Sequence, residues 1–348
     1  MTKHILVTGG AGYIGSHTAV ELLAAGYRVS IADNYINSSP KIFERLKIIT
    51  GEDIPHYEID LCDNTKVDEL FAANDFDGVI HFAGLKAVDT SVAEPIRYYK
   101  NNLISTLNIC EALVKYKVGT IIFSSSAAVY GQPETIPIIE DTPLHPANPY
   151  GGGKAMCEQI LRDMAAAFPT IRVALLRYFN PVGAHHSGLI GEDPHGKPDN
   201  LTPYILRVAV GKLPELNIFG DDYQTPDGTG VRDYLHVVDL AKGHIAALEH
   251  PAEAGQAPVY NLGTGRGYSV FEMLHAFEKA CGHTIAHRIA PRRPGDSGTS
   301  YADASRAERE LNWKAEKTLE EMAEDGWRWQ SMNPDGYDSP IPQQAPTT

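Results

Sequence analysis

The chain has 348 residues, of which 43% are hydrophobic, enough to bury the core of one large α/β domain or of two smaller ones. Thirty Lys and Arg against 44 Asp and Glu leave a net charge of −14, which argues against nucleic acid as a partner. No apolar run approaches the roughly 20 residues that a membrane helix needs. The first residues lack a secretory pattern and the four cysteines form no CxxC pair, so we expect a cytoplasmic protein with reduced thiols.

The first half of the chain alternates short apolar runs with longer helical patterns. Strands are expected at residues 5–7, 29–31, 78–82, 120–123 and 172–176, with helices at 16–25 and 104–115 among them. The strand candidates are continuously apolar, as in a parallel sheet covered on both faces. The order therefore predicts an α/β fold over residues 1–179, a Rossmann-type, doubly wound parallel sheet.

The composition changes after residue 179. Residues 180–219 are rich in Gly, Pro, His and Asn, and later patterns indicate helices near 203–210 and 269–281 and a strand and helix over 231–248. We predict a smaller, mixed C-terminal domain over residues 180–338 that binds the substrate. Residues 231–262 are expected to return to the Rossmann sheet, and residues 339–348 to form a disordered tail.

A glycine-rich turn follows the first expected strand. Residues 8–15 read TGGAGYIG, which places glycines at Gly9, Gly10, Gly12 and Gly15. Such glycines let backbone N–H groups approach a pyrophosphate at a helix N-terminus. The pattern is weak alone, but its place between a strand and a helix favours dinucleotide binding.

Asp33 ends the second expected strand, near the ~20-residue offset of an acidic group that binds a ribose diol. Its charge would repel a 2′-phosphate and no Arg lies within residues 34–40, so NAD is favoured over NADP. Asp60 and Leu61, which we place at the end of the third strand, before the run at residues 78–82, are positioned to meet the adenine edge, although an ordinary strand-end turn would also carry them.

Tyr150 and Lys154 form a Tyr-x-x-x-Lys pair downstream of a Ser-rich strand end at residues 124–126. At positions i and i+4 they share one face of a helix. A free Tyr has a pKa of about 10, but a nearby ammonium and a positive nicotinamide stabilise the phenolate and lower that pKa. Together with the dinucleotide turn, the pair predicts Tyr150 as a catalytic base supported by Lys154.

Three glycines, Gly151 to Gly153, separate this pair. Each costs about 1 kcal/mol relative to Ala in a helix. A conflict with local propensity often marks a functional site. Two explanations stay open: backbone that packs close to a cofactor or another helix, or a tolerated first turn that begins at Pro149.

These residues resemble the extended short-chain dehydrogenase/reductase family, and within it the UDP-hexose 4-epimerases. The resemblance runs from His4 to about Tyr337. It includes HFAGLKAV at residues 81–88, LRYFNPVGAH at 176–185, GTGVRDY at 228–234, YNLG at 260–263 and PRRPGD at 291–296. It implies a two-domain fold, tightly held NAD and a homodimer, whose helices we place at residues 98–115 and 150–167.

The resemblance also implies the members of the site, motif by motif. The catalytic residues would be Tyr150, Ser126 and Lys154. NAD would be bound by Gly9, Gly12, Tyr13, Ile14, Gly15, Asp33, Asn34, Asn37, Ser38, Asp60, Leu61, Phe82, Ala83, Gly84, Leu85, Lys86, Asn101 and Phe179, besides Tyr150 and Lys154. The UDP-sugar would meet Asn180, Asn200, Leu201, Asn217, Ile218, Phe219, Arg232, Tyr234, Arg293, Asp296 and Ser300.

The implied reaction interconverts UDP-glucose and UDP-galactose at C4 through a 4-keto sugar. Tyr150 would take the proton of the 4-hydroxyl, and Ser126 would hydrogen-bond the same oxygen. Arg232 and Arg293 suit a diphosphate because guanidinium groups form paired hydrogen bonds to its oxygens. The small Ser300, at a wall of the sugar pocket, would also admit UDP-GlcNAc and UDP-GalNAc.

Two other functions compete with this one. An NDP-sugar 4,6-dehydratase begins with the same oxidation but needs an added acid and base, where this chain has Ala127 and Ala128. A non-catalytic, NAD-binding sensor should lack Tyr150 or Lys154. His185, His186 and His195 lie in a loop without a paired carboxylate spacing, so we expect no metal.

Overall fold

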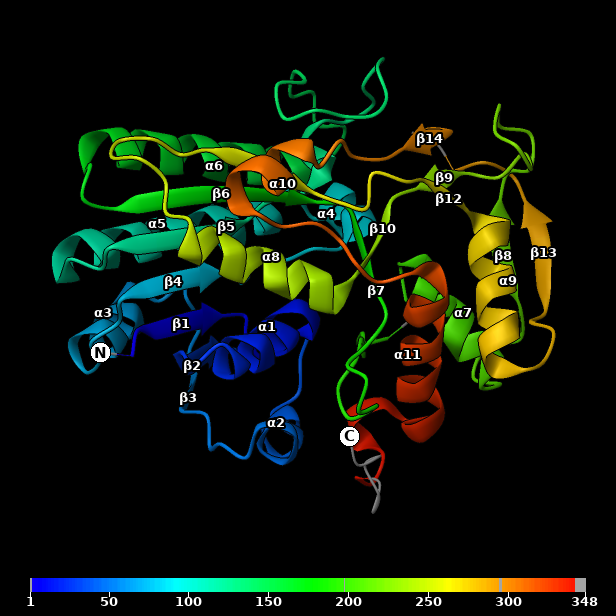
Figure 1. Ribbon diagram of the computed structural model, residues 1–348, viewed down its shortest axis with the longest axis horizontal. Helices are drawn as coiled ribbons and strands as arrows, with labels where there is room; N and C mark the ends of the chain where they lie inside the picture. Colours follow the sequence, from blue (N-terminus) through cyan, green and yellow to red (C-terminus); the bar gives the residue numbers. More distant parts are fainter. Residues whose placement is uncertain (1, 197, 294–295, 342–348) are drawn as a thin grey trace.

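A seven-stranded parallel sheet forms the body of the computed structural model, which describes residues 2–196, 198–293 and 296–341 (Figure 1). The strand order is β11-β6-β5-β4-β1-β2-β3, and every neighbouring pair runs parallel. The strands are β1 His4–Thr8, β2 Arg28–Asp33, β3 His56–Glu58, β4 Gly78–His81, β5 Thr120–Ser124, β6 Arg172–Tyr178 and β11 Val259–Leu262.

Helices cover both faces of this sheet. The helices around it are α1 Tyr13–Ala24, α2 Ile42–Thr50, α3 Asn64–Ala72, α4 Val88–Ala93, α5 Pro95–Tyr116, α6 Pro149–Ala167 and α8 Val237–Glu249. Side chains alternate along each strand, so Val7 joins the buried cluster that includes α1 and α8, and its neighbour Leu6 joins the cluster of α3, α5 and α6. Strands buried on both sides explain the continuous apolar runs, and the predicted Rossmann-type fold class is confirmed.

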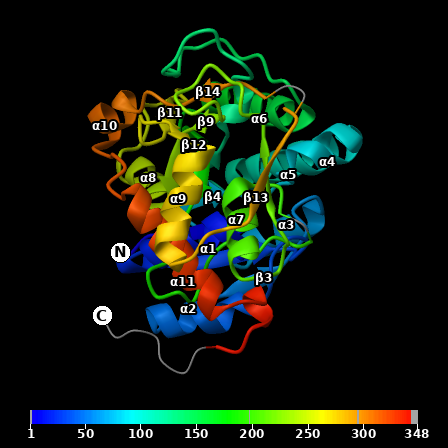
Figure 2. The same ribbon diagram turned by 90° about the vertical axis from the view of Figure 1, so that its right-hand side faces the viewer.

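The C-terminal half builds a smaller unit with its own buried cluster (Figure 2). Its helices are α7 Leu201–Ala209, α9 Val270–Cys281 and α11 Leu319–Met332. Its short sheets pair β7 Asn180–Val182 with β10 Tyr234–His236, β8 Leu216–Phe219 with β13 His287–Ala290, and β9 Val231–Arg232 with both β12 Tyr268–Ser269 and β14 Thr299–Ser300. A further helix, α10 Ser305–Leu311, packs against β11 and α8.

Several boundaries differ from the sequence-based expectation. α5 begins at Pro95, well before the expected residue 104, because proline suits the first turn of a helix. β3 ends at Glu58, so Asp60 and Leu61 lie just beyond the strand. Ser339, the first residue of the predicted tail, is buried and its carbonyl accepts a hydrogen bond; residues 342–348 lie outside the described residues. No helix among the described residues is long and apolar enough to cross a bilayer.

Candidate active site

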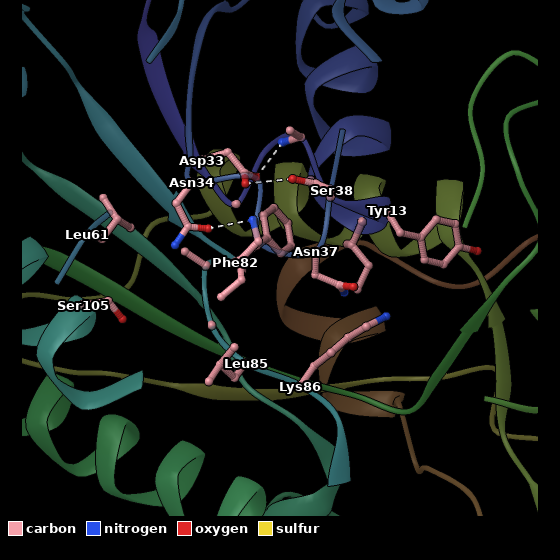
Figure 3. A pocket seen from close by; sticks show the side chains of 18 of the residues that line it. Tyr13, Asp33, Asn34, Asn37, Ser38, Leu61, Phe82, Leu85, Lys86 and Ser105 are labelled. Carbon is pink, nitrogen blue, oxygen red and sulfur yellow. Dashed lines mark hydrogen bonds between the residues drawn. The ribbon is translucent and has the colours of Figure 1, made fainter. Parts of the chain in front are cut away.

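A cleft opens where the carboxyl ends of β1, β2 and β4 meet (Figure 3). This is the edge at which doubly wound sheets bind ligands. Predicted site residues that line the cleft are Gly9, Gly12, Tyr13, Ile14, Gly15, Asp33, Asn34, Asn37, Ser38, Asp60, Leu61, Phe82, Ala83, Gly84, Leu85, Lys86, Asn101, Tyr150 and Lys154. Phe179 is not in this wall; its buried ring packs with Val129 and Tyr130.

The glycine-rich turn forms a tight floor for the cleft. A Cβ at Gly9 would lie 2.8 Å from the Ala83 nitrogen, and Gly9 has a φ of +67°, which favours glycine. A Cβ at Gly15 would collide with the Gly9 carbonyl. α1 then starts at Tyr13 with no side-chain cap and no acidic residue in its first turn. Its first N–H groups therefore suit an anion such as a pyrophosphate.

Asp33 stands at the end of β2, beside this turn. Its carboxylate accepts hydrogen bonds from the Ala11 and Tyr35 backbone N–H groups, at 3.0 and 2.9 Å, and from the Ser38 hydroxyl at 2.9 Å. Burial raises the pKa of Asp33, and these three donors oppose the rise. Asp33 also lines the cleft, where a ribose hydroxyl could donate to its carboxylate. The residues present therefore fit the adenosine end of NAD.

Tyr150 and Lys154 lie on the first turns of α6. Asn148 caps this helix by accepting the Gly151 N–H at 2.8 Å. Burial raises the pKa of the Tyr150 phenol, while its hydrogen bond with Ser126 and the charge of Lys86 oppose the rise. Lys154 donates to the Ser124 carbonyl at 2.7 Å, and burial lowers the pKa of this amine to about 8. The Ser126 hydroxyl thus contacts that of Tyr150, with two cationic side chains nearby; Tyr150 lines the cleft, whereas Ser126 is not among the lining residues.

Lys86 and Glu192 join two parts of the chain at the cleft. Lys86 follows β4, whereas Glu192 belongs to the loop after β7; the Lys86 Nζ lies 2.9 Å from the Glu192 Oε1. Burial opposes the charge of Lys86, but the Glu192 carboxylate outweighs it and raises the pKa of this amine. Lys86 therefore stays charged near Tyr150, and it is the cation whose charge opposes the burial-driven rise of the Tyr150 pKa.

The three glycines of α6 do not have equal surroundings. A Cβ at Gly151 would lie 2.5 Å from the Ala128 carbonyl oxygen, and one at Gly152 would lie 3.0 Å from the Tyr99 hydroxyl. At Gly153 the nearest atom would be 3.8 Å away, an ordinary contact. Close packing of α6 therefore requires glycine at Gly151, on the turn Ala127–Val129 that follows Ser126.

None of the predicted UDP-sugar residues lines this cleft, although all of them are described. They gather in the C-terminal unit. Asn180 pairs with Tyr234 in the β7–β10 sheet, and Arg232 pairs with Ser300 in the β9–β14 pair. Arg293 lies over the Phe219 ring at 5.0 Å and forms an ion pair with Asp296 at 2.9 Å, beside the undescribed residues 294–295. The Asn217 side chain accepts from Arg288, Ile218 is buried, and Leu201 begins α7 after Asn200.

Eleven further lining residues were not predicted: Ala11, Ala32, Ile36, Ile59, Ser105, Tyr178, Gly191, Glu192, Asp193, Pro194 and Tyr337. Some are neighbours of predicted residues on the same turns. The last five form an outer wall from two segments far apart in the sequence, and no local pattern marks them. Among the described residues, no group of three or more His, Cys, Asp or Glu could hold a metal ion.

Comparison with known proteins connects this geometry to a family. The profile of the NAD dependent epimerase/dehydratase family matches residues 5–263. The UDP-glucose 4-epimerase of Bacillus subtilis (strain 168) is 60% identical over 335 residues, which are 96% of this chain and 99% of that protein. A crystal structure of the UDP-glucose 4-epimerase from Bifidobacterium longum, in complex with NAD+ and UDP, is 57% identical with a TM-score of 0.92, over 96% of this chain and 100% of that one.

The UDP-Glc/GlcNAc 4-epimerase of Campylobacter jejuni is a more distant structural relative. It is 37% identical with a TM-score of 0.82, and the match covers 94% of this chain and 99% of that one. The family match spans most of the sheet and the glycine turn, and the first relative extends over nearly the whole chain. The chain therefore belongs to the NAD dependent epimerase/dehydratase family.

Proposed function

We propose that this protein is a UDP-glucose 4-epimerase, an isomerase that uses NAD in the cleft and interconverts UDP-glucose and UDP-galactose. The observation that carries the proposal is the hydrogen-bonded pair of Tyr150 and Ser126 hydroxyls beside a dinucleotide-type cleft. The relatives named above support the substrate, because they share nearly the full length of the chain.

Each residue of the cluster has a role in this reaction. NAD, when bound, accepts a hydride from C4 of the sugar and gives it back. Tyr150 takes the 4-hydroxyl proton, which Ser126 helps to transfer because the two hydroxyls already contact. The charge of Lys86 favours the phenolate, and we assign the same role to Lys154, which lies one helical turn from Tyr150 on α6. The same groups return the proton when the keto sugar has turned over.

The C-terminal unit would hold the UDP part of the substrate. The charges of Arg232 and Arg293 both oppose the rise that burial gives to the Tyr234 pKa, so both arginines lie in the neighbourhood of this phenol, and their guanidinium groups suit the oxygens of a diphosphate. Binding energy from the nucleotide then keeps the keto sugar in place without fixing its orientation. Loose contact with the sugar and firm contact with UDP are both needed for the sugar to present its other face.

We also propose turnover of UDP-GlcNAc and UDP-GalNAc. Ser300 is small and only partly buried, opposite Arg232 in the β9–β14 pair. A Tyr at this position would fill the space for a 2-acetamido group, and a steric clash costs more than a missing contact. In Ser300→Tyr, kcat/KM should fall for UDP-GlcNAc and remain unchanged for UDP-glucose. No wild-type turnover of UDP-GlcNAc, or an equal fall for both sugars, would contradict this extension.

A homodimer and a cytoplasmic location complete the proposal. α5 and α6 pack together and leave exposed apolar side chains at Ile96, Ile104, Leu107 and Met156. Their exposed stripe suits a second copy of the chain. Light scattering should give twice the mass of one chain, and Leu107→Glu should lower that mass. A wild-type monomer at micromolar concentration would contradict the dimer.

The cytoplasmic location fits the state of the thiols. All four cysteines are free, as expected in a reducing compartment.

The test of the main function is incubation with UDP-galactose, followed by analysis of the sugar. The wild type should produce UDP-glucose and no net NADH. Tyr150→Phe should lower kcat by about 10²–10⁴-fold with NAD still bound. Tyr116→Phe, which removes a phenol hydrogen-bonded to Asp68 at the far end of α5, is the matched control. A 4-keto-6-deoxy sugar as the product would favour the dehydratase, and near-normal turnover of Tyr150→Phe would remove Tyr150 from the mechanism.

A further inference from the structure

Arg45 is a buried cation whose hydrogen-bond acceptors lie on two other segments of the chain. It lies on α2, and only 1% of its surface is exposed. Its guanidinium donates to the Leu189 carbonyl at 3.1 Å, to the Asn333 side-chain oxygen at 2.5 Å and to the Ser339 carbonyl at 2.8 Å. A charge buried among neutral acceptors is costly, so the position calls for an explanation.

Two aromatic rings complete the surroundings of Arg45. Its guanidinium carbon lies 5.6 Å from the Trp329 ring centroid and 5.3 Å from that of Tyr337. These are cation–π distances. Figures 1 and 2 show α2 next to the C-terminal segment that carries these groups. Arg45 thus connects a helix of the Rossmann domain to the loop after β7 and to the end of the chain.

The same two segments form the outer wall of the cofactor cleft. Tyr337 lines the cleft; its hydroxyl donates to the Gly191 carbonyl at 3.1 Å, and its backbone N–H donates to Asp193 at 2.9 Å. The Trp329 indole donates to the Glu192 carbonyl at 3.3 Å. We define residues 191–194 together with Tyr337 as the outer wall. Arg45 does not line the cleft itself, so it acts on the wall only through the groups that it holds.

The opposite side of the cleft is attached to the same helix. The strand end at Asp33 leads into the cleft residues Asn34, Asn37 and Ser38, and α2 begins a few residues later at Ile42. Arg45 therefore joins the helix that follows the adenosine side to the two segments that carry the outer wall. A 4-epimerase regenerates its oxidised cofactor in each turnover, so it gains from a cleft that seldom opens.

We propose that Arg45 is a positioning residue that fastens the outer wall and thereby sets how slowly NAD leaves the enzyme. The inference rests on the proposed binding of NAD in this cleft. Loss of the guanidinium would free the Leu189 loop and the C-terminal segment together, because both lose a charge-assisted hydrogen bond at once. The wall would open more often, while Tyr150 and Ser126, which Arg45 does not touch, would keep their geometry.

The experiment measures the rate of NAD release from the purified holoenzyme after transfer to NAD-free buffer. Arg45→Met, which keeps volume and removes the donors, should release NAD at least 10-fold faster, with kcat at saturating NAD within about threefold of the wild type. Tyr337→Phe, which loses only the hydroxyl bonded to Gly191, should change the rate in the same direction. Lys41→Met removes an exposed ion pair to Asp338 at 2.8 Å and should leave it unchanged.

Different results separate this inference from the proposed function. If Arg45→Met does not fold, Asn333→Leu decides instead, because it removes an acceptor of Arg45 and Asn333 does not line the cleft. If both Arg45→Met and Tyr337→Phe release NAD at the wild-type rate, Arg45 contributes only to stability and the inference is overturned. This holds even if their melting temperatures are lower. A wild-type protein that binds no NAD would instead overturn the proposed function, and the inference with it.

Discussion

Gly151→Ala is the substitution that most directly links backbone packing to catalysis in this site. The added Cβ would lie 2.5 Å from the Ala128 carbonyl oxygen, about 0.9 Å short of the 3.4 Å at which ordinary contact begins. The obstacle is backbone, so either the start of α6 or the turn at Ala127–Val129 must move. Tyr150 is the residue before Gly151, and Ser126 is the residue before that turn. The movement therefore separates the two hydroxyls.

The size of the effect follows from this displacement. A misplacement of about 1 Å at a reacting group can cost roughly 10²-fold in rate. We therefore expect kcat of Gly151→Ala to fall about 10–100-fold. Helix propensity acts the other way on stability, because Ala is favoured over Gly by about 1 kcal/mol in a helix interior. Gly153→Ala is the matched control, since its Cβ would meet nothing closer than 3.8 Å.

The assay compares kcat for UDP-galactose and the melting temperature of the two variants with those of the wild type. Gly153→Ala should keep its kcat and unfold at an equal or higher temperature. Gly151→Ala should lose kcat while its NAD content stays near that of the wild type. Equal kcat values for both variants would refute the argument that glycine at Gly151 keeps Tyr150 in reach of Ser126.

Three other substitutions test the electrostatics. Asp33→Asn should raise the Kd for NAD about tenfold or more in titration calorimetry, since hydrogen bonds to a charged group contribute roughly 1.5–3 kcal/mol; an unchanged Kd would exclude Asp33 from cofactor binding. Glu158→Gln should lower the free energy of unfolding in urea by about 3–5 kcal/mol, because the fully buried Glu158 pairs with buried Arg177 at 2.6 Å; a loss below about 1 kcal/mol would speak against the pair. Burial lowers the pKa of Lys154 from 10.5 to about 8, so between these pH values the unfolded state binds more protons than the folded state. The free energy of unfolding of the wild type, relative to that of Lys154→Met, should therefore rise as the pH increases from 8 to 10.5. A flat or falling difference would contradict this pKa.

The sheet and the floor of the cleft could be predicted because their signals are local. A short continuous apolar run such as residues 120–123, set between helical patterns, is typical of a buried parallel strand. The glycine turn before Tyr13 and the acidic Asp33 carry their function at fixed spacing along a single β-α-β unit. The Tyr150 and Lys154 spacing likewise places both on one helix face without any long-range contact.

The outer wall could not be predicted, since its contacts join distant segments. Tyr337 meets Gly191 across 146 residues, and Arg45 meets Ser339 across 294. No periodicity or motif marks such a pair before the chain folds. The charge near Tyr150 shows the same limit: spacing points to Lys154, whereas the fold also brings Lys86, from the loop after β4, within range of the phenol.

The most direct test of the proposed reaction is the fate of the hydrogen at C4 of the sugar. UDP-galactose labelled with deuterium at C4 is incubated with the enzyme until it reaches equilibrium with UDP-glucose. The account predicts that the deuterium stays at C4 of both sugars, because hydride leaves and returns within one closed site. Loss of the label to water, or its appearance in free NADH, would contradict the account.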